Sequence, residues 1–143
     1  MWGNGGNGYG PWRTAKALAA PDLDARLEHL DSLRAPEPGV DALTETYRAF
    51  NNFRVARLPW VPAPFFTKLL YFAGYRRGVG GVQPLILDKV VALALPPEVD
   101  IRLPAGRRVP LWTAAEWLKY IRWAAAQPDG AEPDTVETRL FAG

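Results

Sequence analysis

Apolar residues recur at helical spacing along most of the chain, in segments separated by proline and glycine. After Asp22, a favourable N-cap, Leu23, Leu27 and Leu30 fall at positions i, i+4 and i+7. This pattern predicts a helix that closes at residues 36–39, where two prolines and a glycine occur.

Two more helices are predicted around this one. The first covers residues 11–20, with a proline in its first turn, and Pro21 stops it. The second begins near residues 40 and 41 and ends before Pro59. Its apolar stripe consists of Leu43, Tyr47, Phe50 and Phe53. Helical periodicity dominates, and we therefore expect an all-α fold.

A fourth predicted helix, residues 65–75, is apolar almost all round and follows Pro62-Ala63-Pro64, which enters a helix only at its first turn. At about 100° per residue, Lys68 lies about 60° from Phe65 and about 40° from Phe72, inside the aromatic stripe. Burial disfavours a charged lysine and makes the nucleophilic neutral amine accessible. The alternative is that the Lys68 side chain extends to solvent along its aliphatic stem.

Asp88 stands at the end of an apolar, extended approach formed by residues 84–87. Residues 89–95 fit both a short helix and a strand, and the preceding aspartate favours a helix with Asp88 as its N-cap. Capping is also the purely structural explanation for Asp88. The two roles are compatible, because a capping carboxylate is fixed in position.

The length and composition predict one soluble domain over residues 1–143, with residues 1–11 as a glycine-rich loop or ragged end. The absence of cysteine excludes disulfides, a thiol nucleophile and iron–sulfur clusters held by this chain. The apolar runs are far shorter than the roughly 20 residues of a membrane span. We therefore expect no membrane association and a cytoplasmic protein, associated with the nucleoid if the source is bacterial.

The formal charge is only +2, from 17 basic and 15 acidic residues, so bulk charge does not predict a nucleic-acid binder. The distribution is more informative, because no acid occurs between Glu45 and Asp88. The basic residues in this interval include Arg54, Arg57, Lys68, Arg76 and Arg77. They predict a phosphate-facing surface, and the alternative is an ordinary solvated face.

Lys68 and Asp88 belong to a distinctive order of elements: Thr67-Lys68, an apolar helix, a short loop and an apolar tripeptide that ends in Asp88, twenty residues after Lys68. This order resembles the catalytic segment of the 8-oxoguanine DNA glycosylases, in the helix-hairpin-helix DNA glycosylase superfamily. Other segments that look like parts of this family are residues 8–16, Leu58-Pro59, 112–123 and 136–143.

The resemblance implies a DNA repair glycosylase that flips an oxidised purine out of the duplex and excises it. Lys68, matching the family's nucleophile, would attack the sugar C1′ and form a Schiff base that proceeds to strand cleavage, which is AP lyase activity. Asp88 would stabilise the oxocarbenium charge and help to keep Lys68 deprotonated. The implied fold is a compact helical domain of the helix-hairpin-helix glycosylase type, without the usual amino-terminal part.

The implied partner is double-stranded DNA with a damaged base. The family's hairpin holds a phosphate through backbone N–H groups of a glycine-rich turn, whereas this chain has residues 60–64, with two prolines, at that place. Phosphate contacts are therefore expected from Arg54, Arg57, Arg76 and Arg77. Gln83 and Phe141 are candidates for the base pocket. No cofactor is expected, and no metal site, since His29 is the only histidine.

Three functions remain open at this point. The first is the lysine-dependent glycosylase, the second is a catalytically inactive DNA-binding module of the same fold, and the third is a helical protein-interaction domain. The tests that separate them are whether Lys68 is desolvated beside Asp88 and whether the central arginines share one face with them.

Overall fold

The computed structural model describes residues 15–35 and 38–143, and within these residues every regular element is helical apart from one isolated bridge between Ala105 and Arg108. The predicted all-α class is therefore confirmed. The elements are α2 (Leu23–Leu27), the 3₁₀ helix η1 (Glu28–Arg34), α3 (Val40–Phe50), α4 (Ala63–Gly74), α5 (Lys89–Ala94), the 3₁₀ helix η2 (Pro97–Val99), α6 (Ala114–Ala125) and α7 (Pro133–Ala142). No helix among the described residues is both long and apolar enough to span a membrane.

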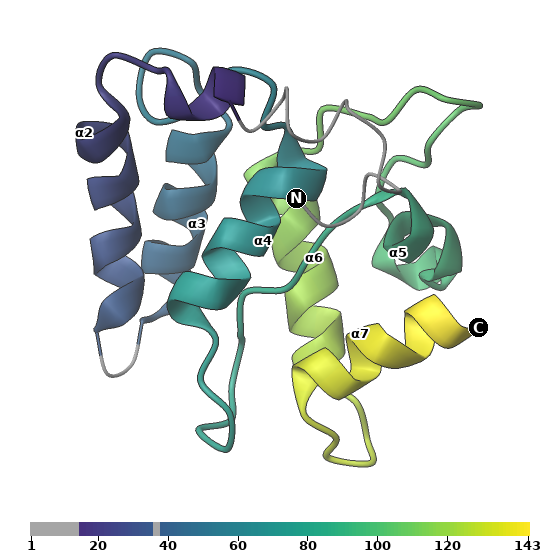
Figure 1. The fold of residues 1–143 in the computed structure, drawn as a ribbon. Helices are drawn as coiled ribbons and strands as arrows, with labels where there is room; N and C mark the ends of the chain where they lie inside the picture. The colour runs from purple at the N-terminus through teal and green to yellow at the C-terminus, as the bar shows by residue number, and fades with distance from the viewer. Residues whose placement is uncertain (1–14, 36–37) are drawn as a thin grey trace.

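The helices form one packed body (Figure 1). α2, η1 and α3 lie side by side at one edge, α4 and α6 occupy the middle, and α5 packs against α7 at the other side. α3 contacts η1, α4 and α6, so it joins the first half of the chain to the second.

Aromatic contacts among α3, α4 and α6 make the centre of the core. The fully buried Tyr47 ring stacks on Trp117 and meets Phe66 edge-on, with both centroids 5.0 Å away. The Tyr47 hydroxyl donates a hydrogen bond of 2.7 Å to the carbonyl of Trp112. Because a buried hydroxyl needs a partner, this bond fixes the chain entering α6 against α3.

The predicted helices are confirmed with changes at their ends. Residues 15–18 of the helix predicted over residues 11–20 are helical, and residues 11–14 lie outside the described residues. The carboxylate of Asp22 does not cap α2, because it pairs with Arg26 instead. The prediction that Phe53 belongs to the apolar stripe of this helix was wrong. α3 ends at Phe50, the chain turns, and Phe53 is 58% exposed.

The extended approach to Asp88 is confirmed, and its backbone is held by side chains rather than by a neighbouring strand. Trp117 Nε1 donates to the carbonyl of Leu85 (3.0 Å), the carboxylate of Glu137 accepts from the Ile86 amide (2.7 Å), and Thr67 Oγ1 accepts from the Leu87 amide (3.0 Å). A buried backbone group without a partner is costly, so these three side chains make the extended path possible.

Burial makes Glu137 sensitive to pH. Glu137 is only 5% exposed, and this burial raises its pKa from 4.5 to about 7. The Ile86 amide and the Tyr120 hydroxyl oppose the rise by hydrogen bonding, while the charges of Asp88 and Asp134 add to it. The folded protein therefore keeps a proton on Glu137 that the unfolded chain releases between about pH 4.5 and pH 7.

We predict that Glu137→Gln flattens the pH dependence of stability. In the native chain, the free energy of unfolding falls as pH rises through this window, by an amount on the order of 2 kcal/mol. Glutamine keeps an oxygen for the Ile86 amide but does not titrate. Urea unfolding at pH 5 and pH 7.5 measures the difference, with the exposed Glu28→Gln as control. Parallel pH profiles for the native protein and Glu137→Gln would contradict the prediction.

Candidate active site

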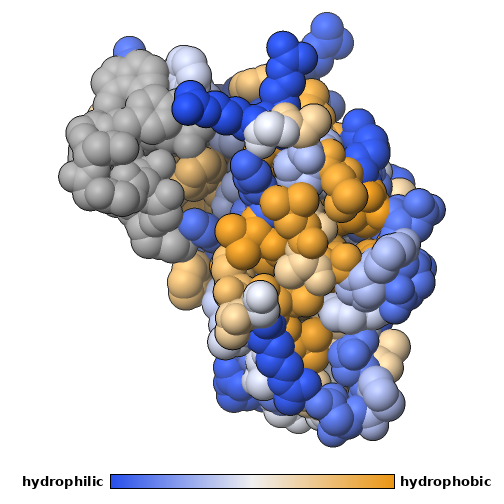
Figure 2. Space-filling view, turned by 90° about the vertical axis from the view of Figure 1, so that its right-hand side faces the viewer, coloured by the Kyte–Doolittle hydropathy of each residue, from blue (hydrophilic) through white to orange (hydrophobic). Residues whose placement is uncertain are grey.

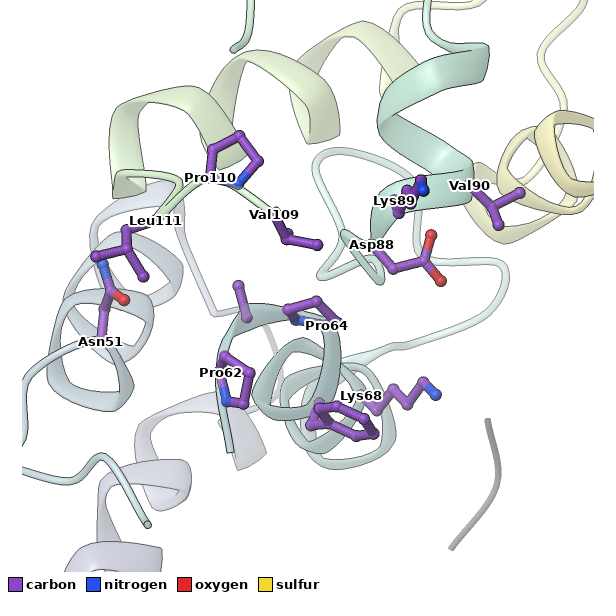
Figure 3. Close-up of a pocket in the computed structure, with 12 residues that line it drawn as sticks. Asn51, Pro62, Pro64, Lys68, Asp88, Lys89, Val90, Val109, Pro110 and Leu111 are labelled. Atoms are coloured by element: carbon purple, nitrogen blue, oxygen red, sulfur yellow. The ribbon is translucent and has the colours of Figure 1, made fainter. Parts of the chain in front are cut away.

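Lys68, on the second turn of α4, and Asp88, at the start of α5, line the same cleft (Figure 3). The cleft has a volume of about 410 Å³. In Figure 3 the two charged side chains extend from facing elements towards the same side of the cleft. The other lining residues are Asn51, Pro62, Ala63, Pro64, Phe65, Lys89, Val90, Val109, Pro110 and Leu111.

The Thr67 hydroxyl ties together the two backbone segments that carry Lys68 and Asp88. The buried Thr67 hydroxyl donates to the carbonyl of Ala63 (2.6 Å), one helical turn earlier, and accepts from the amide of Leu87 (3.0 Å). Thr67 directly precedes Lys68, and Leu87 directly precedes Asp88. The spacing of twenty residues in the sequence thus corresponds to a direct contact between α4 and the segment before α5.

Asp88 caps α5, as predicted. Its backbone is extended, and its Oδ1 accepts a hydrogen bond of 2.9 Å from the amide of Val91. This bond fixes the carboxylate at the wall of the cleft. Capping and a place in the cleft therefore coexist in one residue.

Lys68 is half-buried, with its Nζ 5.4 Å from the centroid of the Phe65 ring. Desolvation by burial lowers the pKa of Lys68, and the negative charge of Asp88 opposes this by raising it. The net direction is downward, which favours the neutral amine. The expectation that Asp88 helps to keep Lys68 deprotonated is thus corrected: burial favours the neutral form, and Asp88 favours positive charge.

The family of this chain follows from a comparison with known protein families. Residues 1–141 match the family described as "Putative 8-oxoguanine DNA glycosylase OGG-like protein". The chain belongs to this OGG-like family. No curated protein and no solved structure matches it.

The four arginines predicted to contact phosphate do not form one surface in this OGG-like protein. Arg54 and Arg57 precede α4, whereas Arg76 and Arg77 follow it, and this helix of 12 residues is about 18 Å long. Arg76 donates to the carbonyls of Ala73 and Tyr75, and Arg77 forms an ion pair with Asp134. The helix predicted over residues 65–75 already stands between the two pairs in the sequence, and its length keeps them at its opposite ends.

The two residues proposed for the base pocket lie outside the cleft. Gln83 is buried and holds the loop after α4, since its Oε1 accepts from the Arg76 amide (2.9 Å) and its Nε2 donates to the Gly80 carbonyl (3.1 Å). Phe141, near the end of α7, is 46% exposed and is not among the lining residues. No group of three or more potential metal ligands occurs among the described residues.

The sequence interpretation missed a basic turn at the rim of the cleft. Lys89 lines the cleft, and its Nζ donates to the carbonyl of Gly106 (2.8 Å) in the turn closed by the bridge between Ala105 and Arg108. Arg107 and Arg108 are exposed and form no ion pair with a described residue. Their adjacency after a glycine was the only signal in the sequence.

Many other cations of the OGG-like protein are neutralised locally. The basic residues with an acidic partner include Arg26, Arg34, Arg48, Arg77, Arg102, Lys119 and Arg139. The basic turn and Lys89 therefore give the rim of the cleft a positive charge, although the net charge of the chain is small.

We predict that Thr67→Val destabilises the fold by about 1–3 kcal/mol, because it leaves the buried Leu87 amide without an acceptor while preserving the side-chain shape. Thr67→Ser retains the hydroxyl and is the matched control, with only the loss of a buried methyl group. Urea unfolding measures both variants. Equal stabilities of Thr67→Val and the native protein would show that this hydrogen bond does not hold the two segments together.

Proposed function

We propose that this OGG-like protein is a DNA glycosylase with AP lyase activity that excises an oxidised purine such as 8-oxoguanine. The observation that carries the proposal is the shared cleft: Lys68, whose pKa is lowered by burial, lines it together with Asp88. A cleft of about 410 Å³ falls within the range of small-ligand sites and is suited to a flipped nucleotide.

In the proposed reaction, the neutral amine of Lys68 attacks C1′ of the flipped nucleotide. A C1′–N bond forms, the glycosidic bond breaks, and the base leaves with the electron pair and takes up a proton. The lysine nitrogen then gives up one of its two protons, the C1′–O4′ bond breaks so that the sugar ring opens and O4′ takes up a proton, and the protonated C1′=N Schiff base forms. Loss of a C2′ proton expels the 3′ phosphate, which is the lyase step.

Asp88 contributes through its charge. Its negative charge raises the pKa of Lys68, which means that it stabilises positive charge at this place in the cleft. The same interaction favours an oxocarbenium-like transition state and the cationic Schiff base. Its position as the cap of α5 keeps the carboxylate oriented without rearrangement during the reaction.

The distribution of charge supports DNA as the partner. Lys89 lines the cleft and contacts the turn that carries Arg107 and Arg108, and Arg57 lines a neighbouring groove that shares Pro62 with the cleft. Phosphates of a duplex that crosses the cleft can contact both sides. This rim equally serves a catalytically inactive DNA-binding module, which is the second candidate function.

A third candidate function, that of a protein-interaction domain, is supported by an exposed apolar surface. Figure 2 shows apolar side chains gathered on one face of the molecule. The helices α5 and α7 pack together, and their exposed apolar residues include Val90, Leu93 and Phe141. Such a patch is typical of an interaction surface, but it lacks the chemistry of the cleft.

The central experiment is borohydride trapping with duplexes that contain 8-oxoguanine or an abasic site. We expect a covalent adduct with the native protein, none with Lys68→Ala, and adduct formation slower by roughly 100- to 1000-fold with Asp88→Asn. Lys119→Ala, whose lysine pairs with Asp100 away from the cleft, is the control. A folded native protein that forms no adduct, or an adduct that survives Lys68→Ala, excludes the Schiff-base mechanism.

A separate prediction concerns the rim. Removal of one phosphate-binding side chain should reduce the slope of log affinity against log salt by about 0.9, so Arg107→Ala/Arg108→Ala should lower it by up to about 1.8. The control is Arg34→Ala/Arg48→Ala, which removes two exposed arginines that already pair with acids. Fluorescence anisotropy at several salt concentrations gives the slopes. Indistinguishable slopes for the two double variants would remove the rim from the DNA interface.

A further inference from the structure

The turn before α4 carries a tryptophan where the backbone favours glycine. The amide of Val61 donates to the carbonyl of Leu58 (3.2 Å), which closes a four-residue turn with Pro59 and Trp60 in its middle. Trp60 has φ 61°, in the left-handed region. With proline at the second position, the third position of such a turn normally holds glycine or asparagine. A bulky aromatic residue is unfavourable there, and function is one reason to keep it.

The same turn forms a groove with exposed aromatic faces. Trp60 is 49% exposed and Phe53 is 58% exposed, and both line a groove of about 350 Å³ together with Arg57 and two prolines. The Arg57 guanidinium lies 4.4 Å from the centroid of the Phe53 ring. Its Nε is buried and has no hydrogen-bond partner among the described residues, and the guanidinium gives the groove a positive charge.

This hairpin groove, lined by Phe53, Arg57, Pro59, Trp60 and Pro62, adjoins the cleft. Pro62 lines both the groove and the cleft that contains Lys68. No acidic residue occurs in the sequence between Glu45 and Asp88, and none lines the groove. The groove is therefore apolar, aromatic and positively charged, and it adjoins the proposed reaction site at Pro62.

We propose that the hairpin groove binds an unpaired nucleobase of the DNA, stacked on the Trp60 and Phe53 rings, beside the nucleotide that enters the cleft. Every base has an aromatic face, so stacking is tolerant of sequence, and Arg57 complements the negative charge of the strand. Flipping a nucleotide leaves its partner without a Watson–Crick pair, which supplies an unpaired base. This inference rests on the proposed function, in which the cleft receives a flipped nucleotide.

The test compares two duplexes of the same sequence: one fully paired, and one with a tetrahydrofuran abasic-site analogue opposite 2-aminopurine. We expect the native protein to prefer the second and to change its 2-aminopurine fluorescence. Trp60→Ala should bind the second duplex at least about fivefold more weakly, which is the lower end of the range for the loss of one base-stacking contact. The slope of log affinity against log salt should not change. Trp60→Phe should keep most of the preference.

Two variants separate stacking from folding and from general aromatic exposure. Trp60→Gly removes the ring at a φ that glycine adopts freely, so it should remain folded and lose the same preference. Phe72→Ala removes an exposed aromatic ring of α4 that lines neither the groove nor the cleft, and it should bind as the native protein does.

Native affinity and native fluorescence change in folded Trp60→Ala would overturn the inference, and so would an equal loss of binding in Phe72→Ala. Borohydride trapping by Lys68 distinguishes this failure from that of the proposed function. An adduct with undiminished binding by Trp60→Ala removes only the stacking site. If the native protein forms no adduct but Trp60→Ala still loses the preference for the second duplex, the stacking site stands and only the glycosylase chemistry is excluded.

Discussion

Three side chains from three helices hold the backbone of residues 85–87, and the position of Asp88 depends on them. Thr67 belongs to α4, Trp117 to α6 and Glu137 to α7, and each satisfies one backbone group of the segment. Since no described strand pairs with this segment, its path is set by helix packing. The core of α3, α4 and α6 therefore also fixes the distance between the two residues of the candidate site.

The cleft combines two opposing electrostatic effects. Burial against α4 lowers the pKa of Lys68, and the carboxylate of Asp88 raises it. The first effect favours the neutral amine in the free protein, and in the proposed reaction the second would favour the cationic species formed after attack. Around the cleft, Lys89, Arg107 and Arg108 form no ion pair with an acid of the described chain, so a protein of nearly neutral net charge still has a positively charged rim at this cleft.

Local patterns predicted the parts of the structure that depend on short-range interactions. Helical spacing located the helices, the cap at Asp88 followed from residue type, and the angular position of Lys68 indicated its partial burial. Features that depend on tertiary packing were missed. Phe53 leaves its predicted stripe because the chain turns after α3, Gln83 bonds within a loop, and the basic turn at Arg107 reaches the cleft through the contact of Lys89 with Gly106.

The pKa of Lys68 is the most direct test of the central claim, which is that burial prepares this amine beside Asp88. The chain has four lysines, so carbon-13 labelling of the lysine side chains gives a simple NMR titration, and Lys68→Ala assigns the signal. Lys68 is expected to titrate below its ordinary pKa of 10.5, and lower still in Asp88→Asn, because the opposing carboxylate charge is gone. A pKa at or above 10.5 in the folded native protein, or a rise in Asp88→Asn, would contradict it.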